Sequence, residues 1–146
     1  MDVELVKALA KAGGYAAVAL AAVGSATGAG IAGQAAIAAW KRCYAQNKPA
    51  PFLLVAMAGA PLSQTIYGMI LMMLLNGGNG NGIFYMLMGI FAGFGLMASA
   101  IFQGKAAAAG CDAFGETGKG FTNYLTVVGI VETVALFVLV FGIIVL

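Results

Sequence analysis

The stretch Gly129-Ile130-Val131-Glu132-Thr133-Val134-Ala135-Leu136-Phe137 places one carboxylate inside a long apolar run. Glu132 is the only acidic residue between Gly118 and Leu146. A helix of about 25 residues, rising about 1.5 Å per residue, spans the hydrocarbon core of a bilayer, which puts Glu132 roughly midway. A charge there costs at least about 2.5 kcal/mol by insertion scales. Two interpretations follow: a protonated Glu that only bonds a neighbouring helix, or a site for a cation in transit.

The composition predicts an integral, all-α membrane protein. Of 146 residues, 62% are hydrophobic and 8% are charged, and the apolar residues fall in four long runs. The absence of His removes the commonest metal ligand and general base. A net charge of +2, confined to loops, does not indicate nucleic acid. Cys43 and Cys111 lack a CxxC spacing and are interpreted as packed, free thiols.

The four runs predict transmembrane helices over about 13–40, 51–75, 83–114 and 121–146. The charges near the N-terminus are mixed, and the run after them is too long for the apolar region of a signal peptide, so we expect a mature helix there. Residues 1–78 and 79–146 are expected to form two helical hairpins of a single membrane domain. Residues 76–82 are all Asn or Gly, so we expect an uncharged, flexible turn there.

The orientation follows from the basic residues. Five Lys and Arg residues lie toward the two intra-hairpin turns, at 41, 42, 48, 105 and 119, and only two lie opposite, at 7 and 11. Under the positive-inside tendency, both turns are cytoplasmic and both termini lie outside.

Small residues recur every fourth position in the first helix. Gly24, Gly28 and Ala32 form one such series, and Gly30 belongs to another. In the third helix Gly95 is followed by Ser99. Small residues at this spacing let helix backbones approach closely in lipid. Because they occur on several faces, they favour a crowded inner ring of helices over a simple helix dimer, and we expect Gly24, Gly28, Gly30 and Gly95 to pack within such a ring.

The two halves of the chain repeat in parallel orientation. A shift of 71 residues matches Gly24 to Gly95, and a shift of 68 residues places Gln64 on Glu132. One half therefore has a carboxylate where the other has an amide.

Several polar side chains are predicted to share the depth of Glu132. Counting from the cytoplasmic turns puts Gln64, Gln103 and Glu132 within roughly 5 Å of one another in depth. Ser63 adjoins Gln64, and Tyr67 lies about one turn further along. One charge with several neutral oxygens suits a hard monovalent cation such as Na⁺. A proton would need only Glu132, and each glutamine alone could simply bond another helix.

Pro61 lies near the middle of the second predicted helix. It has no N–H, so the carbonyl of Met57 loses its helical partner and a bend is expected.

With these features the sequence resembles the rotor-ring proteolipid, known as the K or c subunit, of V-type and archaeal-type rotary ATPases. The resemblance rests on the Gly- and Ala-rich first helix, the hairpin repeat and three segments: Ala60–Gly68 (APLSQTIYG), Phe102–Gly110 (FQGKAAAAG) and Val131–Thr133 (VET). It implies that Glu132 is the essential carboxylate for Na⁺, with Gln64, Gln103, Ser63 and the Ala60 carbonyl as ligands and Tyr67 as a hydrogen-bond donor to the carboxylate. Ser63 and Leu62 stand where sodium-type members often have Thr and Gly, and Ser retains the hydroxyl.

The resemblance also implies a rotary mechanism. Copies would form a homo-oligomeric ring in lipid, pass cations to a stator subunit bearing an essential arginine, and grip central-stalk subunits through the cytoplasmic turns. A prokaryotic plasma membrane is expected. The chain has no phosphate-binding loop, so it would be part of an enzyme but catalyse nothing alone. No cofactor is expected, and Na⁺ or H⁺ would be the transported ion. The alternatives are a ring that carries H⁺ only, a small multidrug/H⁺ antiporter, and a purely structural proteolipid, which leaves Glu132 unexplained.

Overall fold

The computed structural model describes residues 2–78 and 80–146, and in these residues the structure is helical with no strand. Four of its segments are long and apolar enough to cross a membrane, so the fold is that of a four-span, all-α membrane protein. The elements are α1 (Val3–Ala45), α2 (Leu54–Gly59), the 3₁₀ turn η1 (Ala60–Leu62), α3 (Ser63–Asn76), α4 (Gly82–Thr117) and α5 (Phe121–Val145). The α2, η1 and α3 segments together form the second span.

The first helix is longer than its apolar run. It begins at Val3 and not near residue 13, because the Asp2 side chain accepts a hydrogen bond of 3.4 Å from the Glu4 N–H. Glu4 also lies in the first turn, where a negative charge stabilises the helix. With 43 residues, α1 is about 64 Å long, about twice the thickness of the hydrocarbon core. Its ends therefore extend beyond the membrane.

The second span is interrupted at Pro61, as expected from the missing N–H. The helix ends at Gly59, passes through the 3₁₀ turn that contains Pro61, and resumes at Ser63. The span begins at Leu54, three residues later than predicted, because residues 51–53 form a turn. The Trp40 Nε1–H donates a hydrogen bond of 2.8 Å to the Pro51 carbonyl and so ties this turn to α1.

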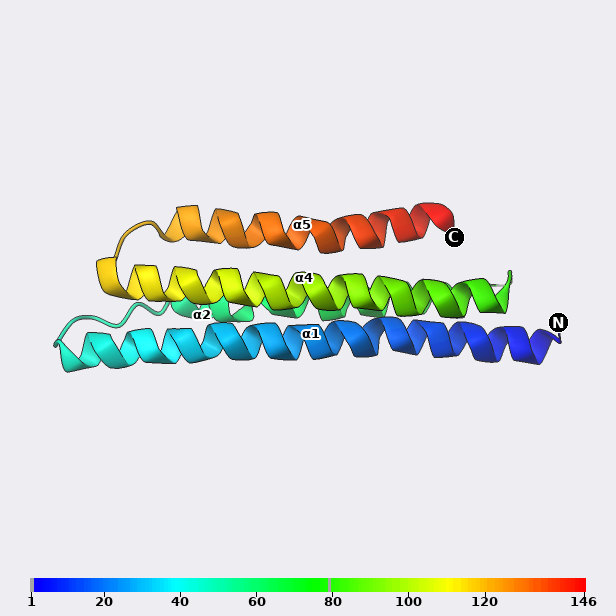
Figure 1. The fold of residues 1–146 in the computed structure, drawn as a ribbon, viewed down its shortest axis with the longest axis horizontal. Helices are drawn as coiled ribbons and strands as arrows, with labels where there is room; N and C mark the ends of the chain where they lie inside the picture. Colours follow the sequence, from blue (N-terminus) through cyan, green and yellow to red (C-terminus); the bar gives the residue numbers. More distant parts are fainter. Residues whose placement is uncertain (1, 79) are drawn as a thin grey trace.

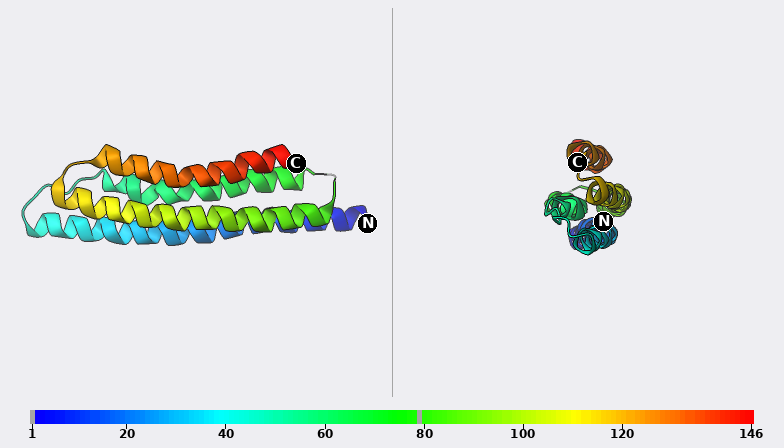
Figure 2. Two further views of the ribbon diagram at one scale, coloured as in Figure 1. Left: turned by 45° about the horizontal axis from the view of Figure 1, so that its top comes forward. Right: turned by 90° about the vertical axis from the view of Figure 1, so that its left-hand side faces the viewer.

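The four spans lie side by side along one axis (Figure 1). The turns that join α1 to α2 and α4 to α5 lie at one end, and the two chain ends lie at the other (Figure 1). Viewed down the axis, α1 and α5 occupy opposite edges, with α3 and α4 between them (Figure 2). The predicted boundary between the two hairpins falls at residue 79, which lies outside the described residues.

The α4–α5 turn depends on two glycines. Gly118 ends α4 with φ of 66° and donates a hydrogen bond of 2.8 Å to the Phe114 carbonyl, and Gly120 precedes α5 with φ of 83°. Both conformations are left-handed and favour glycine, so the turn can reverse within three residues.

The closest helix contact joins α1 to α4 within the chain. A Cβ added at Gly28 would collide with the Ala100 carbonyl oxygen, and one at Gly24 would lie 2.5 Å from Met97 Cα. A Cβ at Gly104 would collide with Gly28 Cα. These glycines therefore let two backbones touch, as small residues do in membranes.

The four glycines expected to pack within a ring lie in three different environments. Gly24 and Gly28 belong to the intrachain α1–α4 contact just described. Gly95 faces Val138 of α5, where an added Cβ would lie 3.0 Å from a side-chain methyl. Gly30 is exposed and has nothing within 4 Å of an added Cβ, so its face is open to a neighbouring molecule.

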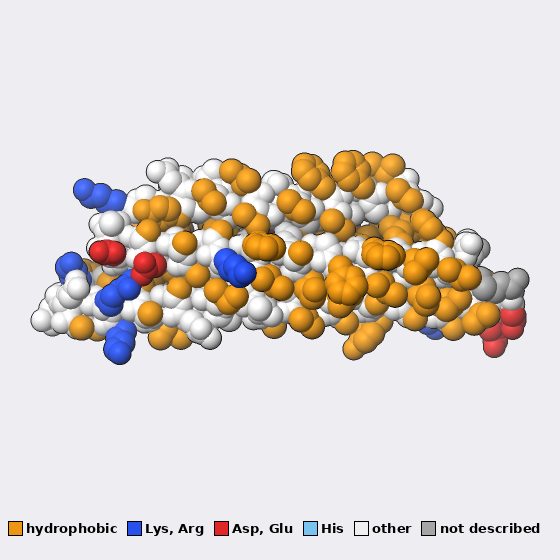
Figure 3. Space-filling model, in the orientation of Figure 1, with side chains coloured by type: hydrophobic (Ala, Val, Ile, Leu, Met, Phe, Trp, Pro, Cys, Tyr) orange, Lys and Arg blue, Asp and Glu red, His pale blue; other side chains and the backbone are white. Residues whose placement is uncertain are grey.

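In Figure 3, most charged side chains lie toward the end that carries the two intra-hairpin turns, and some acidic side chains lie at the opposite end. Apolar side chains cover most of the length between the two ends. At the turn end, Arg42 of α1 forms an exposed ion pair with Asp112 of α4. Such an exposed pair contributes little to stability, because water and salt screen it. The pair links the equivalent ends of the two long helices.

Two buried apolar clusters fill the bundle at different levels. One, toward the turn end, includes Ala32, Met57, Ala107 and Val128, and the other includes Ala21, Leu71, Leu96 and Ala135. Along the first three spans, the buried residues between the two clusters are polar or small, apart from Pro61. Cys43 and Cys111 are buried free thiols, as expected, and Cys111 packs with the cluster toward the turn end.

Candidate cation site

A layer of polar side chains separates the two apolar clusters. In the described residues, the buried polar side chains are Ser25, Gln64, Ser99 and Gln103. Half-buried Ser63, Tyr67 and Glu132 adjoin them. The layer draws on all four spans, because each repeat supplies polar residues near mid-helix.

Glu132 receives a hydrogen bond on each carboxylate oxygen. Tyr67 Oη donates to Oε1 at 2.6 Å, and Gln103 Nε2 donates to Oε2 at 3.1 Å. Hydrogen bonds to charged groups are worth about 1.5–3 kcal/mol each. Side chains from α3 and α4 thus hold the carboxylate of α5 on both sides.

The two glutamines are fully buried and bonded to each other. Gln64 Nε2 donates to Gln103 Oε1 at 2.7 Å, and Gln103 Nε2 also lies 3.3 Å from the Val128 carbonyl oxygen. A continuous chain of hydrogen bonds therefore runs from Gln64 through Gln103 to Glu132. The structure brings together three residues that are 29 to 68 positions apart in the sequence.

Three oxygens meet at the break in the second span. Ser63 Oγ donates to the Ala60 carbonyl oxygen at 3.2 Å and lies 3.2 Å from Gln64 Oε1. The 3₁₀ turn at Pro61 positions both Ala60 and Ser63, because it shifts the backbone between the two helical segments. All six residues predicted for the site, including Tyr67, thus lie in one connected network.

Ser99 also belongs to this network, although sequence analysis treated it only as a small packing residue. Its Oγ accepts from Gln64 Nε2 at 3.4 Å and donates to the Val131 carbonyl at 3.2 Å. The only sequence signal for this role was its place four residues before Gln103, on the same face of α4.

The carboxylate lies near one edge of the bundle. Glu132 is half-buried, while Gln64 and Gln103 are fully buried behind it. Its neighbours on α5, Thr133 and Phe137, are exposed. A group bound by Glu132 is therefore enclosed on the α3 and α4 side and accessible from the outer side of α5.

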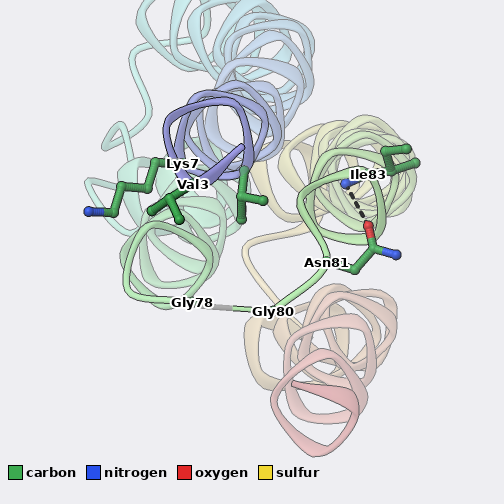
Figure 4. Close-up of a pocket in the computed structure, with 7 residues that line it drawn as sticks. Val3, Lys7, Gly78, Gly80, Asn81 and Ile83 are labelled. Atoms are coloured by element: carbon green, nitrogen blue, oxygen red, sulfur yellow. Dashed lines mark hydrogen bonds between the residues drawn. The ribbon is translucent and has the colours of Figure 1, made fainter. Parts of the chain in front are cut away.

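A separate pocket of about 620 Å³ lies at the end opposite the intra-hairpin turns. Its lining residues include Val3, Lys7, Asn81 and Ile83, and Asn81 Oδ1 accepts the Ile83 N–H to cap α4 at 3.0 Å (Figure 4). Lys7 extends away from α4 (Figure 4). No acidic side chain is among the residues that line this pocket, so it is distinct from the carboxylate site.

The helix pair that carries Glu132 matches a known family. Residues 86–145 match the family model for the C subunit of ATP synthase. The matched part covers α4 from Met86 onward, the turn after it and all of α5. No curated protein matches the chain.

The match to this ATP synthase family supports a rotor-ring proteolipid, which carries ions and is not catalytic. Proteins of this family form oligomeric rings within ATP synthase-type complexes. The match includes Gln103 and Glu132 and stops short of Gln64. The part of the chain that is similar to this family is thus one hairpin, and it is preceded by a second hairpin with the same direction.

Proposed function

We propose that this chain is the rotor-ring subunit of a V-type rotary ATPase of a prokaryotic plasma membrane, and that it carries Na⁺ on Glu132. The observation that carries the proposal is the network of Gln64, Gln103 and Ser63 around this single carboxylate. A proton site needs only the carboxylate and leaves the two fully buried amides without a role beyond helix packing.

The oxygen spacing supports a cation of the size of Na⁺. Ca²⁺, whose radius is close to that of Na⁺, lies about 2.3–2.6 Å from its oxygen ligands, so two ligands at a right angle are about 3.2–3.7 Å apart. Ser63 Oγ lies 3.2 Å from both the Ala60 carbonyl oxygen and Gln64 Oε1. The Glu132 carboxylate would neutralise the charge of a monovalent cation, and these oxygens would replace its water ligands.

The doubled hairpin supports the V-type assignment. Gln64 stands at the position in the first hairpin that corresponds to Glu132 in the second, so one carboxylate serves four spans. A ring of a given circumference then carries fewer ions per rotation, which favours pumping driven by ATP hydrolysis in other subunits. The edge position of Glu132 suits exchange of the ion with a stator subunit bearing an arginine.

The long helices support contacts outside the membrane. The charged turns beyond the apolar span, with Arg42 and Asp112, would face the central stalk on the cytoplasmic side. Copies would surround a common axis with α1 and α4 inside and with the second span and α5 outside.

The test measures modification of Glu132 by a hydrophobic carbodiimide, which attacks a protonated, membrane-buried carboxyl. Purified rings are labelled across a grid of pH and Na⁺ concentration, with K⁺ as the control salt. If Na⁺ and H⁺ compete for Glu132, labelling slows as Na⁺ rises, more Na⁺ is needed at lower pH, and K⁺ protects poorly. A rate that follows pH and ignores Na⁺ would make the ring a proton carrier.

The same material tests the antiporter alternative. A small multidrug antiporter would migrate on a native gel as a dimer, whereas the proposed assembly is a large ring.

A further inference from the structure

Ser25 of α1 lies in the same layer as the candidate cation site. Along α1, Ala21 belongs to one apolar cluster and Ala32 to the other, and Ser25 lies between them. Ser25 is 2% exposed, and its Oγ has no hydrogen-bond partner in the described part of the chain. Burying a hydroxyl without a partner is unfavourable, so this group calls for a physical explanation.

The helix register places Ser25 opposite Gln64. α1 and α3 run antiparallel: a Cβ added at Gly68 would lie 3.0 Å from Ala21 Cβ, and one at Gly28 would lie 2.9 Å from Pro61 Cβ. Ser25 is one turn from Ala21 toward Gly28, and Gln64 is one turn from Gly68 toward Pro61. The two residues therefore face each other across the α1–α3 contact.

Ser25 also lies level with the part of α4 that contacts Gln64. α1 and α4 run parallel, and Gly24 and Gly28 of α1 lie against Met97 and Ala100. This register puts Ser25 near the level of Ser99, which already accepts from Gln64 Nε2 at 3.4 Å. Gln64 thus has two hydroxyls on its inner side, one weakly bonded and one unpartnered among the described residues.

Binding of a cation changes what the Gln64 amide can bond. In the structure, Gln103 presents Nε2 to Glu132 and Oε1 to Gln64. To offer Oε1 to a cation on Glu132, the Gln103 amide must turn, which brings its Nε2 toward Gln64. Two amide donors cannot pair, so Gln64 Nε2 loses Gln103 Oε1 as its acceptor and needs another one, while Gln64 Oε1 stays beside Ser63 Oγ.

We propose that Ser25 is a positioning residue of the cation site, whose hydroxyl accepts the Gln64 N–H that is released when Gln103 turns its oxygen toward a bound cation. The proposal rests on the sodium function proposed above. It explains why the Ser25 hydroxyl is buried without a partner while the two glutamines are bonded to each other, because the Gln64 N–H would turn to it only when a cation binds.

Thr27, two residues further along α1, provides a matched control. Its Oγ1 donates to the Val23 carbonyl four residues back at 2.8 Å, and its side chain is exposed. Thr27→Ala therefore removes a hydroxyl from the same helix without touching the polar layer. Ser25→Ala removes the proposed acceptor, and Ser25→Cys keeps a similar volume with a much weaker acceptor.

The experiment measures two quantities on purified rings of wild type and the three variants. The first is the Na⁺ concentration that halves carbodiimide labelling of Glu132 at fixed pH. The second is the thermal dissociation temperature of the ring with and without Na⁺. For Ser25→Ala, we expect the Na⁺ concentration that halves labelling to rise about three- to tenfold, as for the loss of one hydrogen bond. For Ser25→Cys, we expect a smaller rise.

Without Na⁺, both Ser25 variants should label at the wild-type rate and dissociate at no lower temperature, because the hydroxyl has no partner in that state. Thr27→Ala should match wild type throughout. An unchanged Na⁺ requirement in both Ser25 variants would overturn the role of Ser25 and leave the sodium site standing. Loss of stability to the same extent with and without Na⁺ would make Ser25 an ordinary packing residue. Wild-type labelling that ignores Na⁺ would overturn the sodium function and this proposal together.

Discussion

Tyr67 Oη lies 2.6 Å from Glu132 Oε1 and joins α3 to α5 across 65 positions of sequence. The contact ties the outer half of the first hairpin to the carboxylate of the second. Because both residues are half-buried, the tyrosine also shields one side of the carboxylate. In the proposed function, Glu132 binds an ion and later releases it, and a single hydrogen bond from Tyr67 can break and form again as the carboxylate does so.

Replacing Tyr67 with Phe should free the carboxyl group on one side. The Phe ring retains the packing but removes the donor to Oε1, so Glu132 gains freedom to move toward the outer side of α5. We expect carbodiimide labelling without Na⁺ to become about threefold faster or more at fixed pH, as for the loss of roughly one hydrogen bond. Equal rates in wild type and variant would show that the tyrosine does not restrain the carboxylate.

Replacing Gln103 with Leu should weaken protection by Na⁺ while leaving Glu132 reactive. Leu removes a candidate ligand and leaves Gln64 Nε2 without its 2.7 Å partner. We expect about tenfold more Na⁺ to be needed for half-protection, because the bound cation loses one oxygen ligand. The matched control is Gln34→Leu, since Gln34 is an exposed glutamine on α1, and it should leave the Na⁺ requirement unchanged. If both variants behave like wild type, the glutamines serve helix packing only.

Gly28→Leu should prevent assembly by disrupting the chain itself. Its added side chain would collide with the Ala100 carbonyl and Pro61, so α1 could not approach α4. We expect little intact ring on a native gel and a loss of folded subunit in detergent. Normal yields of intact ring would exclude the close α1–α4 contact.

Gly30→Leu separates packing between copies from packing within the chain. Gly30 and Gly129 both have open space around an added Cβ, and they lie on α1 and α5 respectively. If α1 lies on the inside of the ring, Gly30→Leu should lower the yield of rings from folded subunits, whereas Gly129→Leu should not. Comparable ring yields from the two variants would contradict the inner position of α1.

The orientation can be tested with exposed, engineered cysteines. Cys43 and Cys111 are buried and should react little, so they provide a low background. Lys48→Cys, in the α1–α2 turn, should react with a membrane-impermeant thiol reagent only from the cytoplasmic side. Asn81→Cys, at the other end, should react from outside intact cells. Reaction of Lys48→Cys from outside would reverse the assigned topology.

By itself, the sequence determined the spans and the depth of the charge. Apolar runs long enough to cross a bilayer leave few alternatives to helices, because backbone polar groups must be satisfied within each segment. Pro61 predicted the break in the second span, because its missing N–H removes a backbone hydrogen bond within the same segment. The depth of Gln64, Gln103 and Glu132 followed from counting residues along helices of regular rise.

Only the tertiary structure decided which faces meet. Helix rise sets depth, but rotation and pairing depend on which small residues allow close approach, and the series on α1 offers several faces. The structure places Gly24 and Gly28 against α4 and leaves Gly30 open. It also extends α1 to Val3, through a cap at Asp2 that an apolar pattern cannot reveal. Ser99 and Ser25 resemble packing residues in sequence, and their place in the polar layer follows from the register of α1, α3 and α4, which is set by contacts between residues distant in the chain.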